Sequence, residues 1–214
     1  MNYYIEMNRY RYLLFRIPRF LKQVFYRHYN RFWFSMIGIE YGQRLQVYNK
    51  VYVSGFGHVM IGDDFKFHSG DCLNPICRNI RGAFYLGTSK ARIEIGDRVG
   101  LSSVCLWAND RITIGHDVNI GGDTLIMDND AHPMDFAQRR RLPENHGCSD
   151  VSAKPVVIEN DVWIGARCII LKGVHIGARS VIAAGSIVTK DIPADCVAGG
   201  NPCIVIRQNQ VEQV

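Results

Sequence analysis

The segment Ile158–Val188 reads IENDVWIGARCIILKGVHIGARSVIAAGSIV and places an aliphatic residue at every sixth position. An amphipathic helix needs apolar residues three and four apart, and a half-buried strand needs strict alternation. A period of six therefore fits neither element. The repeated positions are Ile158, Ile164, Ile170, Ile176, Ile182 and Val188.

Six residues per repeat are enough for one short flat face and one corner. Three such hexads close one triangular turn of a parallel β-helix, in which the aliphatic residue points inward and stacks on its equivalent one turn later. Gly165 and Gly177 follow two of these residues, where a Cβ would crowd the corner. The fifth residue of each hexad is small or branched: Val162, Cys168, Val174, Ser180, Ser186, Ile192.

The same period is present, less regularly, earlier in the chain. One extra residue separates two in-phase runs, and between Leu73 and Ile95 the period fails. We therefore interpret residues 77–91 as a distorted turn or loop. The earlier steps are Ile61, Phe67 and Leu73, then Ile95, Leu101 and Trp107, then Ile114, Ile120 and Ile126.

Size and composition are those of one globular domain with an appendage. The chain has 214 residues, 47% of them hydrophobic, which is enough for a sizeable core. No apolar run is long enough to span a bilayer, and the N-terminus lacks the apolar segment of a secretion signal. We expect a cytoplasmic protein. Seven cysteines without zinc-like spacing favour reduced thiols in core or corner positions rather than a metal site.

The basic charge of the chain is concentrated at the N-terminus. Residues 1–34 contain seven Lys or Arg and one Glu, interleaved with aromatic residues and with Pro18 as a kink. One or two amphipathic helices could cap the open end of the β-helix, and could also contact an anionic membrane at its inner face. Nucleic-acid binding is not expected, because the charge does not extend over the rest of the chain. The predicted layout is a helical cap at 1–45, a β-helix domain at 46–207 and a tail at 208–214.

The longest interruption of the hexads is a loop at about 128–155, and it contains the candidate catalytic group. A long loop that leaves a rigid scaffold is usually functional. His132 stands before Pro133 and between Asp130 and Asp135, and a histidine so placed can act as a general base near neutral pH. The loop also contains three consecutive arginines, at 139–141, which favour recognition of an anionic group.

About residues 93–207 resemble the hexapeptide-repeat acyltransferases, in the branch of galactoside, maltose and polysaccharide O-acetyltransferases. The motifs that carry the resemblance are the His132-Pro133 pair, Asn160–Gly165, Gly173–Gly177, Ala184–Pro193 and Ala198–Pro202. The resemblance implies a left-handed β-helix and a homotrimer with active sites between neighbouring subunits. It also implies acetyl-CoA as co-substrate, no metal, and His132 as the base that deprotonates a sugar hydroxyl.

The resemblance further assigns site residues. Gly165 and Ala166 of the neighbouring subunit would offer backbone N–H groups to the oxyanion, and Trp163 would line the cleft or cap a corner. Lys190 and Arg207 would meet the phosphates of the nucleotide, or be ordinary solvated charges. The implied cofactor-binding residues are Trp163, Ala166, Ala184, Thr189, Lys190 and Arg207, and the implied substrate-binding residues are Ser102, Asp110 and Asp130.

Two departures from the family pattern predict a different acceptor. Ile204 stands where the sugar acetyltransferases have an arginine for the nucleotide, and Ser102 stands where they have an asparagine for the sugar. The leading prediction is O-acetylation of a sugar hydroxyl on a cell-surface polysaccharide precursor, and a lipid-linked acceptor would suit the basic, aromatic N-terminal segment. N-acetylation of an amino sugar and a non-catalytic β-helix scaffold remain alternatives. A β-helix carbonic anhydrase is disfavoured because no two histidines stand five residues apart.

Overall fold

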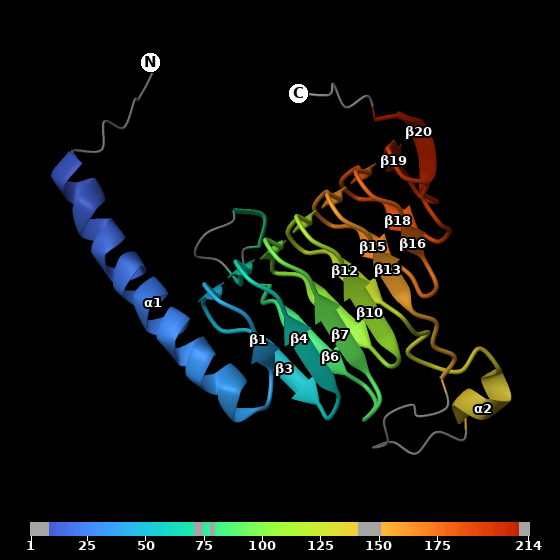
Figure 1. Ribbon diagram of the computed structural model, residues 1–214, viewed down its shortest axis with the longest axis horizontal. Helices are drawn as coiled ribbons and strands as arrows, with labels where there is room; N and C mark the ends of the chain where they lie inside the picture. Colours follow the sequence, from blue (N-terminus) through green and yellow to red (C-terminus); the bar gives the residue numbers. More distant parts are fainter. Residues whose placement is uncertain (1–8, 71–74, 78–79, 141–150, 210–214) are drawn as a thin grey trace.

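The chain forms a three-sided parallel β-helix that is entered through one long helix (Figure 1). A computed structural model describes residues 9–70, 75–77, 80–140 and 151–209, with side chains from residue 17 onward. Successive strands belong in turn to three sheets, here called faces A, B and C, which meet at the A–B, B–C and C–A corners. The expected fold class is therefore confirmed.

Each face stacks one short strand from every turn of the coil. Face A consists of β1 (Glu40–Tyr41), β4 (His58–Ile61), β7 (Arg92–Ile95), β10 (Arg111–Ile114), β13 (Val156–Ile158) and β16 (His175–Ile176). Face B consists of β2 (Gln46–Tyr48), β5 (Lys66–His68), β8 (Gly100–Ser102), β11 (Asn119–Ile120), β14 (Trp163–Ile164), β17 (Val181–Ile182), β19 (Cys196–Gly199) and the antiparallel β20 (Ile204–Gln208). Face C consists of β3 (Tyr52–Gly55), β6 (Ala83–Leu86), β9 (Cys105–Ala108), β12 (Leu125–Met127), β15 (Ile169–Ile170) and β18 (Ile187–Val188).

The hexad residues fill the interior as one apolar column per face. Ile158, Ile164 and Ile170 are at most 1% exposed, and each pairs in register with the equivalent residue of the turns before and after it. The three sheets cover one another on their inner sides, so the coil buries aliphatic area without a second layer, and this burial is the main source of its stability.

Two details of the sequence prediction are wrong. Leu106, and not Trp107, is the inward residue of β9: Leu106 is fully buried, while Trp107 lies on the outer side against Tyr85. The corner before β9 is one residue shorter than the hexad, which shifts the phase. Residues 77–91 are not only a loop, because β6 (Ala83–Leu86) continues face C between β3 and β9. Leu73 lies outside the described residues.

A second excursion accompanies the one predicted at 128–155. The chain leaves face B at the end of β5 and returns to face C at β6, with the single-turn helix η1 (Pro75–Cys77) between them. The predicted excursion separates β12 from β13 and contains the short helix α2 (Phe136–Arg140).

Ion pairs join successive turns along the A–B corner. The guanidinium of Arg98 binds the carboxylate of Asp117 at 2.7 and 2.8 Å, and Arg179 binds Asp195 at 2.6 and 2.7 Å. Arg98 and Asp117 both have positive φ, the backbone conformation that turns the chain at this corner. Hydrogen bonds from the arginines hold the pKa of Asp117 and of Asp195 below the usual range.

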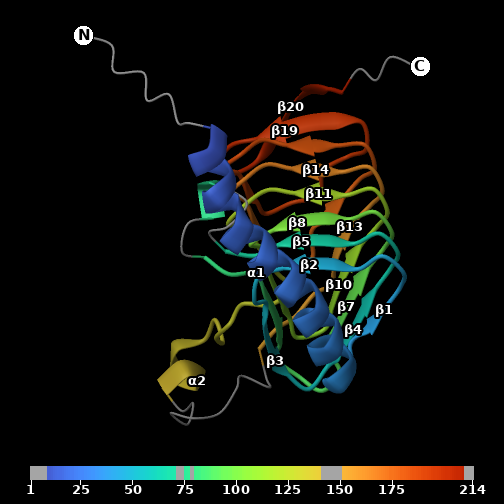
Figure 2. The ribbon, with the colours of Figure 1, turned by 90° about the vertical axis from the view of Figure 1, so that its left-hand side faces the viewer.

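A single helix, α1 (Arg9–Met36), caps the first turn of the coil and is continuous through Pro18. Its last third makes the contacts: Asn30 donates to the carbonyls of Val47 and Asn49, Arg31 donates to the carbonyl of Leu45, and Phe34 is fully buried. Figure 2 shows the helix lying obliquely across the open end of the coil. The first strand, β1, begins at residue 40, inside the range expected for the cap. No helix in the described part of the chain has the length and apolarity needed to cross a bilayer.

Candidate active site

A groove of about 270 Å³ lies on the outer side of face B. Strand register aligns Lys66, Gly100, Asn119 and Trp163 in one row, because each directly precedes the inward residue of its hexad. Gly100 opens the groove between its neighbours, since an ideal Cβ there would lie 2.7 Å from the Asn119 side-chain oxygen. Trp163 is 60% exposed and forms one wall, which is compatible with the wall predicted from the sequence.

A second row of this groove contains His68 and the predicted residue Ser102, which are paired in register. The ring centroids of His68 and Tyr48 are 5.1 Å apart. Burial, together with the charge of Lys66, lowers the pKa of His68. His68 is therefore neutral near pH 7, so that it can both donate and accept a hydrogen bond. The sequence prediction missed Lys66, His68 and Asn119, although their hexad positions match those of Ser102 and Trp163.

The B–C corner is lined by residues that have almost no side chain. Gly165 lies so close to Ala184 of the next turn that an ideal Cβ on Gly165 would be 2.5 Å from the backbone nitrogen of Ala184. An ideal Cβ on Gly121 would be equally close to the backbone nitrogen of Ala166. Further along the coil, Gly199 and Gly200 continue this column. The result is a smooth strip of backbone at the half-buried Ala166 and the exposed Ala184, which fits an extended chain such as the pantetheine arm of CoA.

Hydrogen bonding separates the two predicted oxyanion donors. The N–H of Gly165 donates to the carbonyl of Ile182 at 2.8 Å, so it is committed to the coil. No hydrogen bond of the Ala166 N–H is found among the described residues. Ala166 is thus the better candidate of the two for an oxyanion donor. At the start of the strip, η1 covers the corner, because Cys77 and Ile76 lie directly over Gly122.

The loop with His132 is fixed to the C–A corner by a buried carboxylate. Asp128 is fully buried, and its two oxygens accept hydrogen bonds of 2.7 Å from the N–H groups of Asn109 and Asp110. Asn129, 2% exposed, accepts from the N–H of Ala131, which has a φ of 61°. The backbone that leads to the histidine is therefore held by two consecutive buried polar side chains.

Beyond this anchor, an ion pair holds the loop against the next turn. The ammonium group of Lys172 binds the carboxylate of Asp130 and also donates to the Ser152 hydroxyl at 3.2 Å. The N–H of His132 donates to the carbonyl of Asp130 at 2.6 Å, and the His132 side chain is exposed. Asp130 thus supports the candidate base, a contact that the prediction of a substrate-binding role did not include.

The arginines after His132 are partly occupied within the loop itself. Arg139 donates to the carbonyls of Pro133 and Met134 at 2.7 and 2.6 Å, and Arg140 lies over the ring of Phe136 at 5.2 Å. Arg141 lies outside the described residues. The charge of Arg139 therefore has a local role in shaping the loop.

The predicted residues fall into groups that one chain cannot bring together. His132, Asp110 and the exposed pair Thr189 and Lys190 follow strands of face C, at the C–A corner. Ser102, Trp163 and Arg207 belong to strands of face B, and Ala166 and Ala184 to the B–C corner. In a three-sided coil the C–A corner lies opposite face B, with the whole core between them. A site that combines His132 with Trp163 would require a second copy of the chain.

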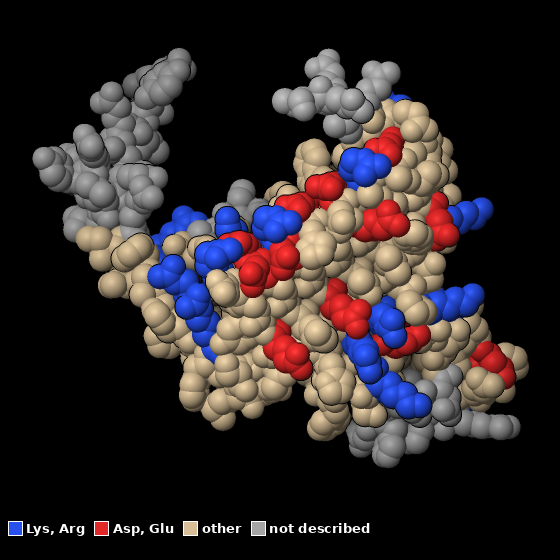
Figure 3. Space-filling model, viewed as in Figure 1, with Lys and Arg blue, Asp and Glu red and all other residues tan. Residues whose placement is uncertain are grey.

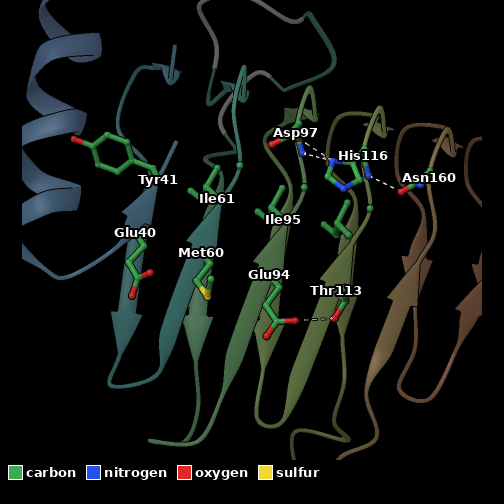
Figure 4. Close-up of a pocket in the computed structure, with 14 residues that line it drawn as sticks. Glu40, Tyr41, Met60, Ile61, Glu94, Ile95, Asp97, Thr113, His116 and Asn160 are labelled. Carbon is green, nitrogen blue, oxygen red and sulfur yellow. Dashed lines mark hydrogen bonds and ion pairs between the residues drawn. The ribbon is translucent and has the colours of Figure 1, made fainter. Parts of the chain in front are cut away.

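Another groove, of about 770 Å³, lies on face A and contains none of the predicted residues (Figure 4). Several polar groups labelled there are engaged with one another. The ring Nδ1 of His116 accepts from the backbone N–H of Asp97 at 3.0 Å, and the backbone N–H of His116 donates to the side-chain oxygen of Asn160 at 2.8 Å. We regard this groove as the open surface of a sheet. Among the described residues no group of three His, Cys, Asp or Glu could hold a metal ion.

Sequence comparisons identify relatives of about half of the chain. A family model described as the hexapeptide repeat of succinyl-transferase matches residues 155–190. Galactoside O-acetyltransferase of Escherichia coli (strain K12) is 43% identical over 109 residues, which are 48% of this chain and 50% of that protein. The chain thus spans about half the length of the curated relatives it matches.

Solved structures extend the similarity to most of the chain. The polySia-specific acetyltransferase NeuO is 30% identical with a TM-score of 0.52, over 81% of this chain and 76% of that one. Galactoside acetyltransferase in complex with coenzyme A is 28% identical with a TM-score of 0.51, over 80% of this chain and 65% of that one. The chain belongs to the hexapeptide-repeat acyltransferase family, whose left-handed parallel β-helix it shares. The resemblance recognised in the sequence is confirmed.

Proposed function

We propose that the protein is an acetyl-CoA-dependent O-acetyltransferase that modifies a sugar hydroxyl, with active sites between the subunits of a homotrimer. The observation that carries this proposal is the position of His132 at the corner opposite the face that contains Trp163. In a trimer, the C–A corner of one subunit can face the groove and the B–C corner of the next. The similarity to proteins named galactoside O-acetyltransferase and polySia-specific acetyltransferase supports a carbohydrate acceptor.

In this mechanism His132 removes the proton of the acceptor hydroxyl while the oxygen attacks the thioester carbonyl carbon. The N–H of Ala166 in the neighbouring subunit stabilises the negative charge that develops on the carbonyl oxygen. The C–S bond then breaks, and the protonated His132 returns its proton to the departing CoA thiolate. The products are the acetyl ester and free CoA, so that no metal or redox partner is needed.

The remaining residues bind the two substrates. Ala166 and Ala184 leave room for the extended pantetheine arm along the B–C corner. Thr189, from the C–A corner of the neighbouring subunit, lies beside its path, and Lys190 of that same corner and Arg207 meet the phosphates. Lys66, His68, Ser102 and Asn119 line the groove beside Trp163 and offer donors and acceptors to sugar hydroxyls. Asp110, at the same corner as His132, is a further acceptor ligand.

The test is acetyl-CoA turnover, followed by thiol release with hydroxyl-sugar and amino-sugar acceptors. Replacing His132 by alanine lowers kcat by about 10²- to 10⁴-fold and preserves binding of CoA in calorimetry. His58→Ala, which removes an exposed histidine of face A, keeps wild-type turnover. Equal activity of the His132 variant and the wild type would remove the proposal, and turnover with amino sugars alone would replace O-acetylation by N-acetylation.

A complementation experiment tests the intersubunit site. In the proposed site one subunit contributes His132 and its neighbour contributes Ala184. The substitutions His132→Ala and Ala184→Trp therefore impair the two sides of the same interface. Co-expression of the two inactive variants restores activity, because one kind of interface in the mixed trimer combines an intact His132 with an intact corner. Activity that stays absent in well-folded mixed trimers would place the whole site within one chain.

A further inference from the structure

Helix α1 carries an apolar ridge on the side that faces away from the coil. Phe34 and Asn30, buried against the first turn, define the inner side of the helix. The ridge consists of five residues on the opposite side, spaced by four, four, seven and four positions, which aligns them along one helical stripe. Its members and their exposed fractions are Ile17 52%, Leu21 60%, Phe25 60%, Phe32 65% and Met36 64%.

Such a row differs from the scattered apolar residues of an ordinary surface. Single exposed apolar side chains need no explanation, but a contiguous exposed stripe marks a surface that binds a partner or a membrane. Folding the coil does not require this stripe, because the hydrogen bonds found between α1 and the coil come from Asn30, Arg31 and Ser35, in the last third of the helix. Figure 1 shows the earlier part of α1 standing away from the coil.

The charge around the ridge has a single sign. Residues 17–36 contain Arg19, Lys22, Arg27 and Arg31 and no acidic residue. Arg31 donates to the carbonyl of Leu45, and Arg19, Lys22 and Arg27 are the other Lys and Arg residues of this stretch. In Figure 3 basic side chains lie along the lower part of α1, and both acidic and basic side chains lie over the coil.

We propose that α1 lies flat on an anionic phospholipid surface, with this ridge in the acyl boundary and its basic residues at the lipid phosphates. An amphipathic helix with aromatic and aliphatic residues on one face and cations beside them is suited to such an interface. A second copy of α1 is a poorer occupant, because pairing two ridges would bring their like charges together. The inference does not depend on the acetyltransferase proposal.

The experiment is flotation of the full-length protein with phospholipid vesicles. Wild-type protein binds vesicles that contain about one-third phosphatidylserine in phosphatidylcholine, and binds pure phosphatidylcholine at least about fivefold less. Leu21→Glu/Phe25→Glu lowers the fraction bound to anionic vesicles by at least about fivefold. Both positions are exposed, so circular dichroism and the melting temperature stay unchanged.

The control is Ile204→Glu/Ile206→Glu, which makes the same charge change at two residues of equal exposure, 65% and 62%, in the last strand. This variant floats with anionic vesicles like the wild type. A wild-type protein that does not bind anionic vesicles, or a Leu21/Phe25 variant that binds as well as the wild type, overturns the proposal. If the ridge variant instead lowers the molar mass in light scattering while wild-type protein ignores vesicles, the occupant is a second copy.

Discussion

The side-chain carboxylate of Asp128 accepts a 2.7 Å hydrogen bond from the backbone N–H of Asp110. These residues lie on consecutive turns of the coil, at the C–A corner where the His132 loop departs. The backbone that leads to the candidate base His132 is thereby held by the rigid coil, and not only by its own loop.

Replacing Asp128 by asparagine weakens the anchor of the loop. An amide keeps one acceptor oxygen and sets its NH₂ group against the other backbone N–H, so we expect the free energy of unfolding to fall by about 2 kcal/mol. Turnover falls as well, because His132 loses its fixed position. Thermal denaturation and kcat measure the two effects. Asp135→Asn, in the exposed N-terminal turn before α2, is the control, and equal losses in both variants would contradict the assignment.

The ion pair between Lys172 and Asp130 positions the base and adds little stability. Both side chains are only about a quarter exposed, and the pair joins the loop to the next turn. Lys172→Met lowers kcat by about tenfold, leaves KM for acetyl-CoA unchanged, and lowers the free energy of unfolding by at most about 1 kcal/mol. Lys154→Met makes the same charge change in the same loop and keeps full turnover. An unchanged kcat in the Lys172 variant would show that the pair has no part in positioning.

Two exposed alanines, Ala184 and Ala194, have the same local geometry, so comparing substitutions at the two positions distinguishes an effect on cofactor binding from an effect on packing. Ala184 covers Gly165 at the B–C corner, and Ala194 covers Gly177 in the same way at the A–B corner. Ala184→Val raises KM for acetyl-CoA by about tenfold or more, because the added methyl groups narrow the strip for the pantetheine arm. Ala194→Val leaves KM unchanged at a similar melting temperature. Equal KM values for the two variants would move the cofactor away from the B–C corner.

The state of His68 depends on burial and on Lys66. Both lower its pKa, burial being the larger cause, so the imidazole remains neutral at pH values where a free histidine takes up a proton. As the pH falls below about 6.5, the unfolded chain binds a proton that the folded chain resists, and stability decreases. Lys66→Met raises the pKa of His68 only in part, because burial remains. NMR titration of the His68 ring measures the shift, and a downward shift would contradict the stated cause.

The aliphatic period predicts the coil, because its six regular positions from Ile158 to Val188 are all buried. A constant spacing of six places Trp107 in the interior, because it cannot show that the corner before β9 is one residue shorter than the hexad and the next corner longer. β6 was missed because Phe84 and Leu86 lie after an excursion that resets the phase.

Those parts of the candidate site that belong to a sequence motif could be predicted from the sequence. His132 and Ala184 stand in short, recognisable runs. The roles of Asp128 and Lys172 come from contacts across turns that no local pattern records. Lys66, His68 and Asn119 could have been found by extending the hexad phase of Trp163 backward to each earlier strand of face B. That phase becomes certain only when the lengths of the excursions are known.

The Arg–Asp pairs of the A–B corner have a consequence for assembly of the coil during folding. Every inward aliphatic residue is nearly equivalent to its neighbour six positions away, so a segment that slips by one hexad still fills the interior. The same slip parts Arg179 from Asp195 and Arg98 from Asp117. These charges therefore distinguish the native winding from its misregistered alternatives, which the interchangeable interior cannot do.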